Sequence, residues 1–250
     1  MEASGKLKNA GRMQWVRFGN TQVNGGTRPY HNRARNLGLN IFSVISLEQL
    51  GEKNWEQTFD RFYSNYSTDI WQIGNEISNP DIHVNPLGAT TIEQFFPKFR
   101  ELYGHVKRKY PQAVLAGPPT FGSVGGPAEL EKFFQLGLLD LDVVVTLNLY
   151  TETALQEYGV VFDRYRSKLT NKRIWVTETG AGPPERHIDW VNNFYPRIIN
   201  ALHPEMVCWY VMWGGDSTAN VHDNDSGLLD NLERGPVIER DLFKALIGSK

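Results

Sequence analysis

Short apolar runs alternate with amphipathic helical segments along the whole chain, and this alternation restricts the possible folds more than any other feature. The runs are rich in β-branched and aromatic residues, which favours buried strands, and the segments between them carry apolar residues at helical spacing. Strict alternation of strand and helix implies parallel pairing through right-handed crossovers. The seven predicted strands lie at residues 13–19, 41–45, 71–74, 113–117, 142–150, 173–178 and 207–213.

The helical segments complete the pattern of an α/β barrel. Helices are expected at residues 31–36, 54–66, 91–109, 127–136, 154–169, 185–202 and 236–247, with the tail of an earlier helix at 5–11. Pro97 is expected to kink its helix or to mark its first turn. We predict a (β/α)8 TIM-barrel type fold, incomplete because only seven strands are recognisable and the few polar residues before Lys6 cannot form the first strand.

Two of the predicted strands end in the same way. Residues 69–77 (DIWQIGNEI) place Glu76 at the tip of one strand, and residues 173–180 (RIWVTETG) place Glu178 at the tip of another. All carboxyl ends of parallel strands open on one face, so the two carboxyls are expected to converge. A buried carboxylate needs a partner, a proton or a catalytic role.

Composition narrows the possible partners. With 250 residues, 40% apolar residues and no low-complexity tract or linker, the chain is expected to be one domain, residues 1–250. Its net charge of −2 gives no general electrostatic reason to expect nucleic acid or an anionic membrane as partner. Cys208 is the only cysteine, which excludes an intramolecular disulfide and a cysteine-rich metal site. No metal or other cofactor is expected.

The compartment and the oligomeric state are left open by the sequence. No window approaches eighteen consecutive apolar residues, and the first twelve residues lack the apolar run of a signal peptide. The chain is therefore expected to be soluble, either cytoplasmic or secreted with a signal that these residues do not include. An open barrel would expose a strand edge at which the chain could self-associate.

The paired glutamates resemble the site of the retaining glycoside hydrolases of clan A, a (β/α)8-barrel group that includes cellulases, mannanases, galactanases and β-xylosidases. In that clan the acid/base Glu follows Asn at the end of the fourth strand, which Asn75 and Glu76 match. The nucleophile Glu ends the seventh strand, which Glu178 matches once one strand is missing at the front. The resemblance covers about residues 6–248.

Other clan positions map onto this chain through the same resemblance. Arg17 matches an arginine of the second strand that braces the nucleophile, and Tyr150 matches a tyrosine that touches it. Asn148 stands where the clan usually has histidine, and Trp213 matches a tryptophan that floors a sugar subsite. Substrate-binding roles are thus expected for Asn75, Arg17, Asn148, Tyr150 and Trp213.

The resemblance implies a retaining, endo-acting β-glycosidase that cleaves β-linked poly- or oligosaccharides by double displacement. Such an enzyme needs one carboxyl as nucleophile and a second as proton donor, which are the roles expected of Glu178 and Glu76. The alternative is a catalytically silent carbohydrate-binding relative, or a barrel fragment whose glutamates are not aligned.

The individual residues could also have purely structural roles. Arg17 could pair with a core acid, Tyr150 could be a rim tyrosine, and Trp213 could be ordinary core. The aspartate-rich loop at residues 216–230 could hold a hard cation, although it lacks the spacing of a calcium loop and a solvated turn is favoured. His83, in the loop after Glu76, stands where a sugar-subsite residue could lie, although a solvated loop is favoured.

Overall fold

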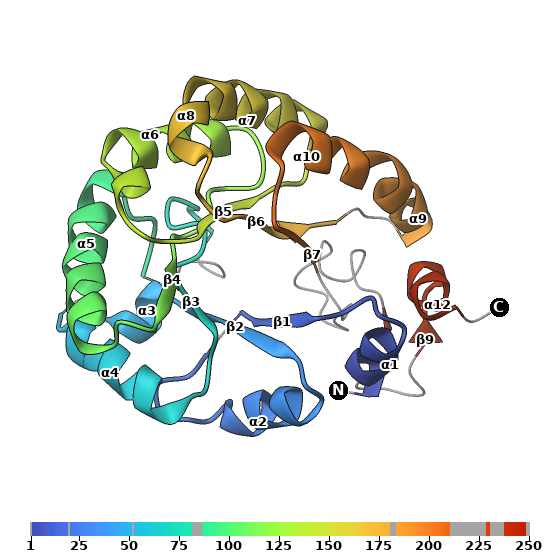
Figure 1. The fold of residues 1–250 in the computed structure, drawn as a ribbon, viewed down its shortest axis with the longest axis horizontal. Helices are drawn as coiled ribbons and strands as arrows, with labels where there is room; N and C mark the ends of the chain where they lie inside the picture. The colour runs from blue at the N-terminus through green and yellow to red at the C-terminus, as the bar shows by residue number, and fades with distance from the viewer. Residues whose placement is uncertain are drawn as a thin grey trace.

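The computed structural model describes residues 2–19, 21–51, 53–81, 87–180, 184–210, 229–230 and 238–248. Seven parallel strands follow one another in chain order around a ring (Figure 1). Two parallel bridges, Ala116 to Val144 and Thr120 to Leu147, join the four-stranded and three-stranded sheets. The strands are β1 (Trp15–Phe18), β2 (Asn40–Ile45), β3 (Ile70–Ile73), β4 (Val114–Ala116), β5 (Val145–Asn148), β6 (Ile174–Thr179) and β7 (Met206–Trp209).

The ring of strands is not closed among the described residues. β1 pairs only with β2, and β7 pairs only with β6, so both present an edge to the same gap. The predicted fold class, an incomplete (β/α)8-type barrel with seven recognisable strands, is confirmed. Both edge strands are half-buried along their length, whereas β3 and β6 are buried throughout.

Helices surround the strands and continue across the gap (Figure 1). No described helix is long and apolar enough to cross a bilayer. The main helices are α1 (Glu2–Asn9), α2 (Arg28–Asn36), α3 (Leu47–Leu50), α4 (Trp55–Asn65), α5 (Ile92–Lys109), α6 (Gly126–Gln135), α7 (Glu152–Arg164), α8 (Arg166–Leu169), α9 (His187–Asp189), α10 (Tyr195–Leu202) and α12 (Asp241–Ile247). Short 3-10 turns at Leu138–Asp140 and Pro184–Arg186 and a π-helical turn at Trp190–Phe194 connect them.

Helix α5 illustrates how local sequence sets an element. The Thr91 hydroxyl accepts a hydrogen bond from the backbone N–H of Gln94, and the Gln94 side chain accepts one from the Thr91 N–H. This capping box starts the helix where the sequence predicted. Pro97 lies inside the helix, so the expectation that it could mark the first turn is wrong.

The sequence prediction is less accurate near the carboxyl end. β7 begins at Met206, one residue before the predicted strand, and ends at Trp209, while residues 211–213 of the predicted strand lie outside the described residues. The last helix begins at Asp241 rather than at residue 236, since Ile238–Glu239 (β9) pairs antiparallel with Leu229–Asp230 (β8). Tyr165 divides the predicted helix at 154–169 into α7 and α8.

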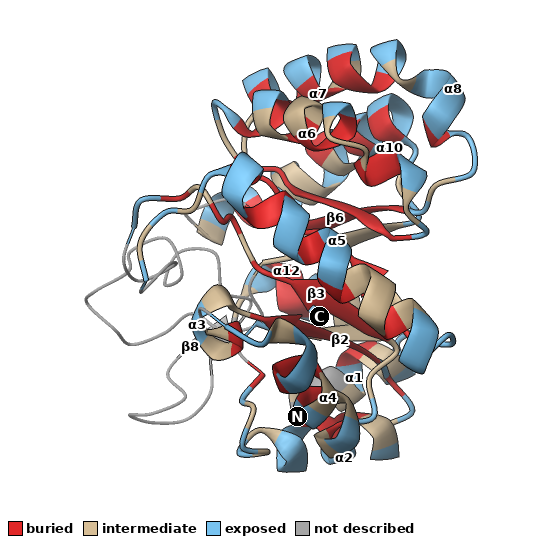
Figure 2. Cartoon of the chain, turned by 90° about the vertical axis from the view of Figure 1, so that its left-hand side faces the viewer, coloured by how far each residue is buried: buried red, intermediate tan, exposed pale blue. Residues whose placement is uncertain are grey.

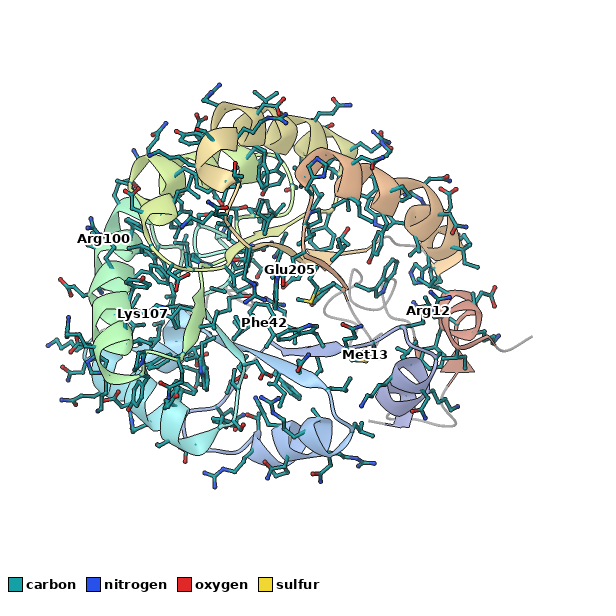
Figure 3. The ribbon with its side chains drawn as sticks, in the orientation of Figure 1. Arg12, Met13, Phe42, Arg100, Lys107 and Glu205 are labelled. Atoms are coloured by element: carbon teal, nitrogen blue, oxygen red, sulfur yellow. The ribbon has the colours of Figure 1, made fainter. Side chains whose placement is uncertain are left out.

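The core has an inner and an outer layer. Alternate strand residues fill the inside of the ring, where Phe42, Ile70, Ala116, Val144 and Trp175 form one buried cluster. The opposite faces of the strands pack against the helices, so the helices are buried on their inner sides and exposed on their outer sides (Figure 2). Figure 3 shows Phe42 inside the ring and Arg100 on the outer side of α5.

A small apolar cluster closes the helical layer outside the gap. Leu7 of α1 packs with Leu242 and Phe243 of α12, and all three are buried. The two ends of the described chain therefore lie side by side where β1 and β7 remain unpaired (Figure 1).

We predict that Phe243→Ala lowers the free energy of unfolding by about 3–5 kcal/mol, because it leaves a cavity in this cluster. Urea unfolding followed by circular dichroism measures the change. Tyr30→Ala is the matched control, since Tyr30 is 58% exposed on α2 and its loss should cost less than about 0.5 kcal/mol. Equal unfolding midpoints for the two variants would contradict the assigned packing.

Candidate active site

Glu76 lies just beyond the carboxyl end of β3, in a backbone conformation that few residues adopt. Gly74 has φ 77° and Glu76 has φ 39°, which is the left-handed region. For a residue with a Cβ this conformation costs about 1–2 kcal/mol. Hydrogen bonds from the Gly74 N–H to the Ile45 carbonyl (2.8 Å) and from the Glu76 N–H to the Pro119 carbonyl (3.1 Å) hold it. The strained turn buries the Glu76 side chain at 7% exposure.

Three N–H groups converge on the Glu76 carboxyl. Its Oε1 atom accepts from Asn148 Nδ2 at 2.9 Å and from the Gly122 backbone N–H at 3.2 Å. Its Oε2 atom accepts from Asn79 Nδ2 at 2.9 Å. These donors come from β5, from the loop after β4 and from the loop after β3, so the carboxyl is held by three segments of the ring.

Glu178 lies near the carboxyl end of β6, at an irregularity in strand pairing. Leu147 of β5 is opposite Val176, but the next residue, Asn148, is opposite Glu178, so Thr177 has no counterpart. Such a β-bulge re-aims the side chains around it. The bulge is why Thr177 and Glu178, although consecutive, both reach the polar end of the barrel interior.

Glu178 accepts hydrogen bonds from a cation and a phenol. Arg17 Nη1 of β1 donates to Oε1 at 2.6 Å, and the Tyr150 hydroxyl donates to Oε2 at 2.9 Å. Arg17 also donates through Nη2 to Asn75 Oδ1 at 2.8 Å and through Nε to Gln72 Oε1 at 3.3 Å. One guanidinium thereby connects the ends of β1, β3 and β6.

The two carboxyls differ in their electrostatic surroundings. Burial raises the pKa of Glu76, the negative charge of Glu178 raises it further, and the three N–H donors oppose this rise. Burial and the neighbouring Glu178 charge raise the pKa of Tyr150 well above its ordinary value, so its hydroxyl keeps its proton. Burial raises the pKa of Cys208 on β7 to about 12, so this thiol adds no charge.

The structure brings together six of the seven site residues that the sequence predicted. Trp213 and His83 lie outside the described residues, as does most of the loop at 216–230, and among the described residues no three metal-ligating side chains gather. Asn148 contacts Glu76 and Thr177, and Asn75 contacts Arg17 and Gln72. The six residues are Arg17, Asn75, Glu76, Asn148, Tyr150 and Glu178.

Sequence reasoning missed four residues that hold the site. Gln72 and Thr177 are strand residues whose side chains face the ring interior, and Asn79 and Gly122 lie in loops. A Cβ on Gly122 would lie 2.3 Å from the Tyr150 ring, so only glycine lets this backbone N–H approach Glu76 without displacing the tyrosine. Of these four residues, only Asn79 has a position that the sequence could have suggested, because it lies three residues after Glu76.

Comparison with known proteins identifies the fold. No protein-family model matches the sequence, and no curated protein matches it. A β-glucuronidase from Ruminococcus gnavus in complex with D-glucuronic acid matches with a TM-score of 0.69 at 13% identity, covering 99% of this chain and 44% of that chain. A family 51 α-L-arabinofuranosidase from Bifidobacterium longum matches with a TM-score of 0.62 at 11% identity, covering 99% of this chain and 66% of that chain. The Saccharomyces cerevisiae Gas2 protein in complex with laminaritetraose and laminaripentaose matches with a TM-score of 0.61 at 11% identity, covering 99% of this chain and 56% of that chain.

The chain has the fold of the clan A glycoside hydrolases. The resemblance found in the sequence is confirmed at the level of the fold. The chain spans roughly half to two thirds of the length of these three structures. In this fold, Glu76 and Glu178 follow the strands that would be fourth and seventh if the gap between β7 and β1 held one more strand.

We predict that Glu178→Gln lowers the pKa of Glu76 toward its ordinary value, because the substitution removes the neighbouring negative charge while leaving Glu76 buried. Carbon-13 NMR titration of protein labelled at the glutamate side-chain carboxyls measures the shift, and Glu76→Gln assigns the signal. Glu205→Gln, which changes a glutamate paired with Arg173, is the control and should leave the titration unchanged. An unaltered Glu76 pKa in Glu178→Gln would show that the two carboxyls do not interact.

Proposed function

We propose that this chain is a retaining β-glycoside hydrolase that cleaves β-linked poly- or oligosaccharides, with Glu178 as the nucleophile and Glu76 as the acid/base. The observation that carries the proposal is the pair of buried carboxyls at the carboxyl ends of β3 and β6, held in unlike surroundings. A double displacement needs this difference, because one carboxyl must react as the anion while the other begins protonated.

The surroundings of Glu178 suit a nucleophile. Arg17 and Tyr150 both donate hydrogen bonds to it, and these bonds stabilise a carboxylate and fix its direction. In the first step this carboxylate would attack the anomeric carbon, and the bond to the leaving oxygen would break. The product of the step is a glycosyl ester of Glu178.

The surroundings of Glu76 suit a proton donor. Burial and the charge of Glu178 favour its protonated form, so it can give its proton to the leaving oxygen. Esterification of Glu178 removes that charge, which lowers the pKa of Glu76 and prepares it to take a proton from water. That water would hydrolyse the ester and restore the β configuration.

Asn75 and Trp213 are proposed to bind the sugar. The Asn75 oxygen accepts from Arg17 and Gln72, which turns its Nδ2 group away from them and makes it available to a sugar hydroxyl. The hydroxyl at carbon 2 is the expected partner, because its hydrogen bonds strengthen in the transition state. We also propose that the enzyme is endo-acting, so that it cleaves bonds inside a polysaccharide chain. The fold neighbours are described with D-glucuronic acid and with laminari-oligosaccharides, which supports a carbohydrate ligand without selecting one sugar.

We predict that Glu76→Ala and Glu178→Ala each lower hydrolysis by at least about 10²–10⁴-fold. Turnover is measured on aryl β-glycosides of glucose, mannose, galactose, xylose and glucuronic acid, and on β-glucan, β-mannan, galactan and xylan. Glu157→Gln, a change at an exposed position of α7, is the control and should retain full activity. Full activity of either alanine variant would refute the assignment.

Azide separates the two roles. In Glu178→Ala, azide would replace the nucleophile and attack the substrate directly, giving an α-glycosyl azide. In Glu76→Ala, azide would attack the glycosyl ester, giving a β-glycosyl azide. Proton NMR of the products distinguishes these outcomes, and exchanged products would reverse the assignment.

A silent carbohydrate-binding protein is the second candidate, favoured by the unpaired edges of β1 and β7 among the described residues. Calorimetric binding of an oligosaccharide, together with no turnover on any of these substrates, would select it.

A further inference from the structure

We propose that Gly122, Asn148 and Thr177 reserve the Oε1 atom of Glu76 as a hydrogen-bond acceptor, so that the proton transferred in glycoside cleavage is carried by Oε2, beside Asn79. The inference rests on the proposed function and assigns one atom of that site. It concerns the acid/base only, and it names Asn79, Asn148 and Thr177 as positioning residues.

The Oε1 atom of Glu76 receives two hydrogen bonds. The Gly122 N–H donates from 3.2 Å and Asn148 Nδ2 donates from 2.9 Å. A carboxyl oxygen has two lone pairs, and these two donors occupy both. A backbone N–H cannot become an acceptor, so a proton on Oε1 would face a donor and break one of the two bonds.

Thr177 fixes the direction of the Asn148 amide. Its hydroxyl has two acceptors within reach, Asn148 Oδ1 at 2.9 Å and the Leu147 carbonyl at 3.2 Å, and donation to the nearer Oδ1 leaves Nδ2 facing Glu76. Reversing the amide would place Oδ1 against the carboxylate. Both side chains are fully buried, so water does not offer them other partners. The bulge leaves Thr177 without a pairing partner on β5, and its hydroxyl lies within hydrogen-bond distance of the Asn148 side chain.

The Oε2 atom is held differently. Asn79 Nδ2 donates to it at 2.9 Å, and the Asp81 N–H donates to Asn79 Oδ1 at 3.0 Å, which orients this second amide. When Oε2 carries the proton it becomes a hydroxyl oxygen, a poorer acceptor than a carboxylate oxygen. The Asn79 bond therefore favours the ionised form strongly, whereas the bonds to Oε1 persist in both forms.

Proton transfer from Oε2 accompanies the attack of Glu178 on the anomeric carbon. The O–H bond of Glu76 and the glycosidic C–O bond break, the proton bonds to the leaving oxygen, the anomeric carbon bonds to Glu178, and Glu76 keeps the O–H electron pair as a carboxylate. The hydrogen bond from Asn79 to Oε2 strengthens as the negative charge develops. The bonds to Oε1 keep the carboxyl in place throughout.

Other titratable groups lie around Glu76 among the described residues. Glu178 faces it from β6, Tyr150 from the end of β5 and Tyr158 from α7, and Glu129 of α6 acts on Tyr158. Both tyrosines keep their protons, because burial raises the pKa of each. The Glu129 carboxylate accepts from the backbone N–H of Phe121 at 3.1 Å and from the hydroxyl of Ser78.

Carbon-13 NMR titration of Glu76 in Asn79→Ala and Thr177→Val tests the proposal. Asn79→Ala should raise the pKa of Glu76 by about one unit, because a hydrogen bond to the oxygen that gains the negative charge is lost. Thr177→Val should raise it by less. Thr146→Val is the matched control, since Thr146 is a buried threonine of β5 that donates to the Gly117 carbonyl and should leave the titration unchanged.

Leaving-group dependence gives a readout that a structural defect would not give. Thr177→Val should lower kcat on a phenyl β-glycoside by about tenfold while changing kcat on the 2,4-dinitrophenyl glycoside little, because the better leaving group needs little protonation. Thr177→Ser keeps the hydroxyl and should restore activity.

An equal shift of the Glu76 pKa in Thr177→Val and in Asn79→Ala would overturn the proposal. The proposal would also fail if the Glu76 pKa in both variants were the same as in Thr146→Val. Full activity of Glu76→Ala would instead refute the proposed function itself, so the two failures are distinguishable.

Discussion

The ion pair between Arg17 and Glu178 is the interaction on which the rest of the site depends. It joins β1 to β6 across the inside of a barrel whose wall is open between β1 and β7 in the described residues. A buried ion pair adds little net stability, because the loss of hydration offsets most of the attraction. Its value here is geometric. Arg17 donates to Glu178, Asn75 and Gln72, so one rigid, planar group sets the relative positions of three strand ends.

Fixing Arg17 against Glu178 leaves Glu76 without a cation among its hydrogen-bond partners that the structure describes. In the part of the chain that the structure describes, Glu76 accepts from two amide side chains and a backbone N–H, whereas Glu178 accepts from a guanidinium. Two identical carboxyl groups thereby become chemically different. The difference is created by the partners that each strand end meets, because both side chains are equally buried at 7% exposure. Burial favours the protonated form of Glu76, and the neighbouring charge of Glu178 adds to this effect.

Sequence reasoning identified the strands, their parallel order and the two glutamates, because these depend on local patterns. Apolar runs define strands, and parallel pairing places their ends on one face. Thr177 was missed because its position depends on a bulge between β5 and β6, and alternation of apolar residues does not encode the register of a neighbouring strand. Asn79 and Gly122 were missed because loop residues are placed by tertiary contacts. The start of the last helix was wrong for a similar reason, since Ile238–Glu239 pairs with Leu229–Asp230.

The position of the bulge connects the fold to the site. A strand without it would turn Thr177 and Glu178 to opposite faces, so that only one of them could reach the barrel interior. With the bulge, Thr177 contacts Asn148 and Glu178 contacts Arg17 and Tyr150. Asn148 in turn donates a hydrogen bond to Glu76, so the bulge connects the residues that hold the two carboxyls. A single extra residue in β6 therefore determines the geometry of both carboxyls, although it lies beside only one of them.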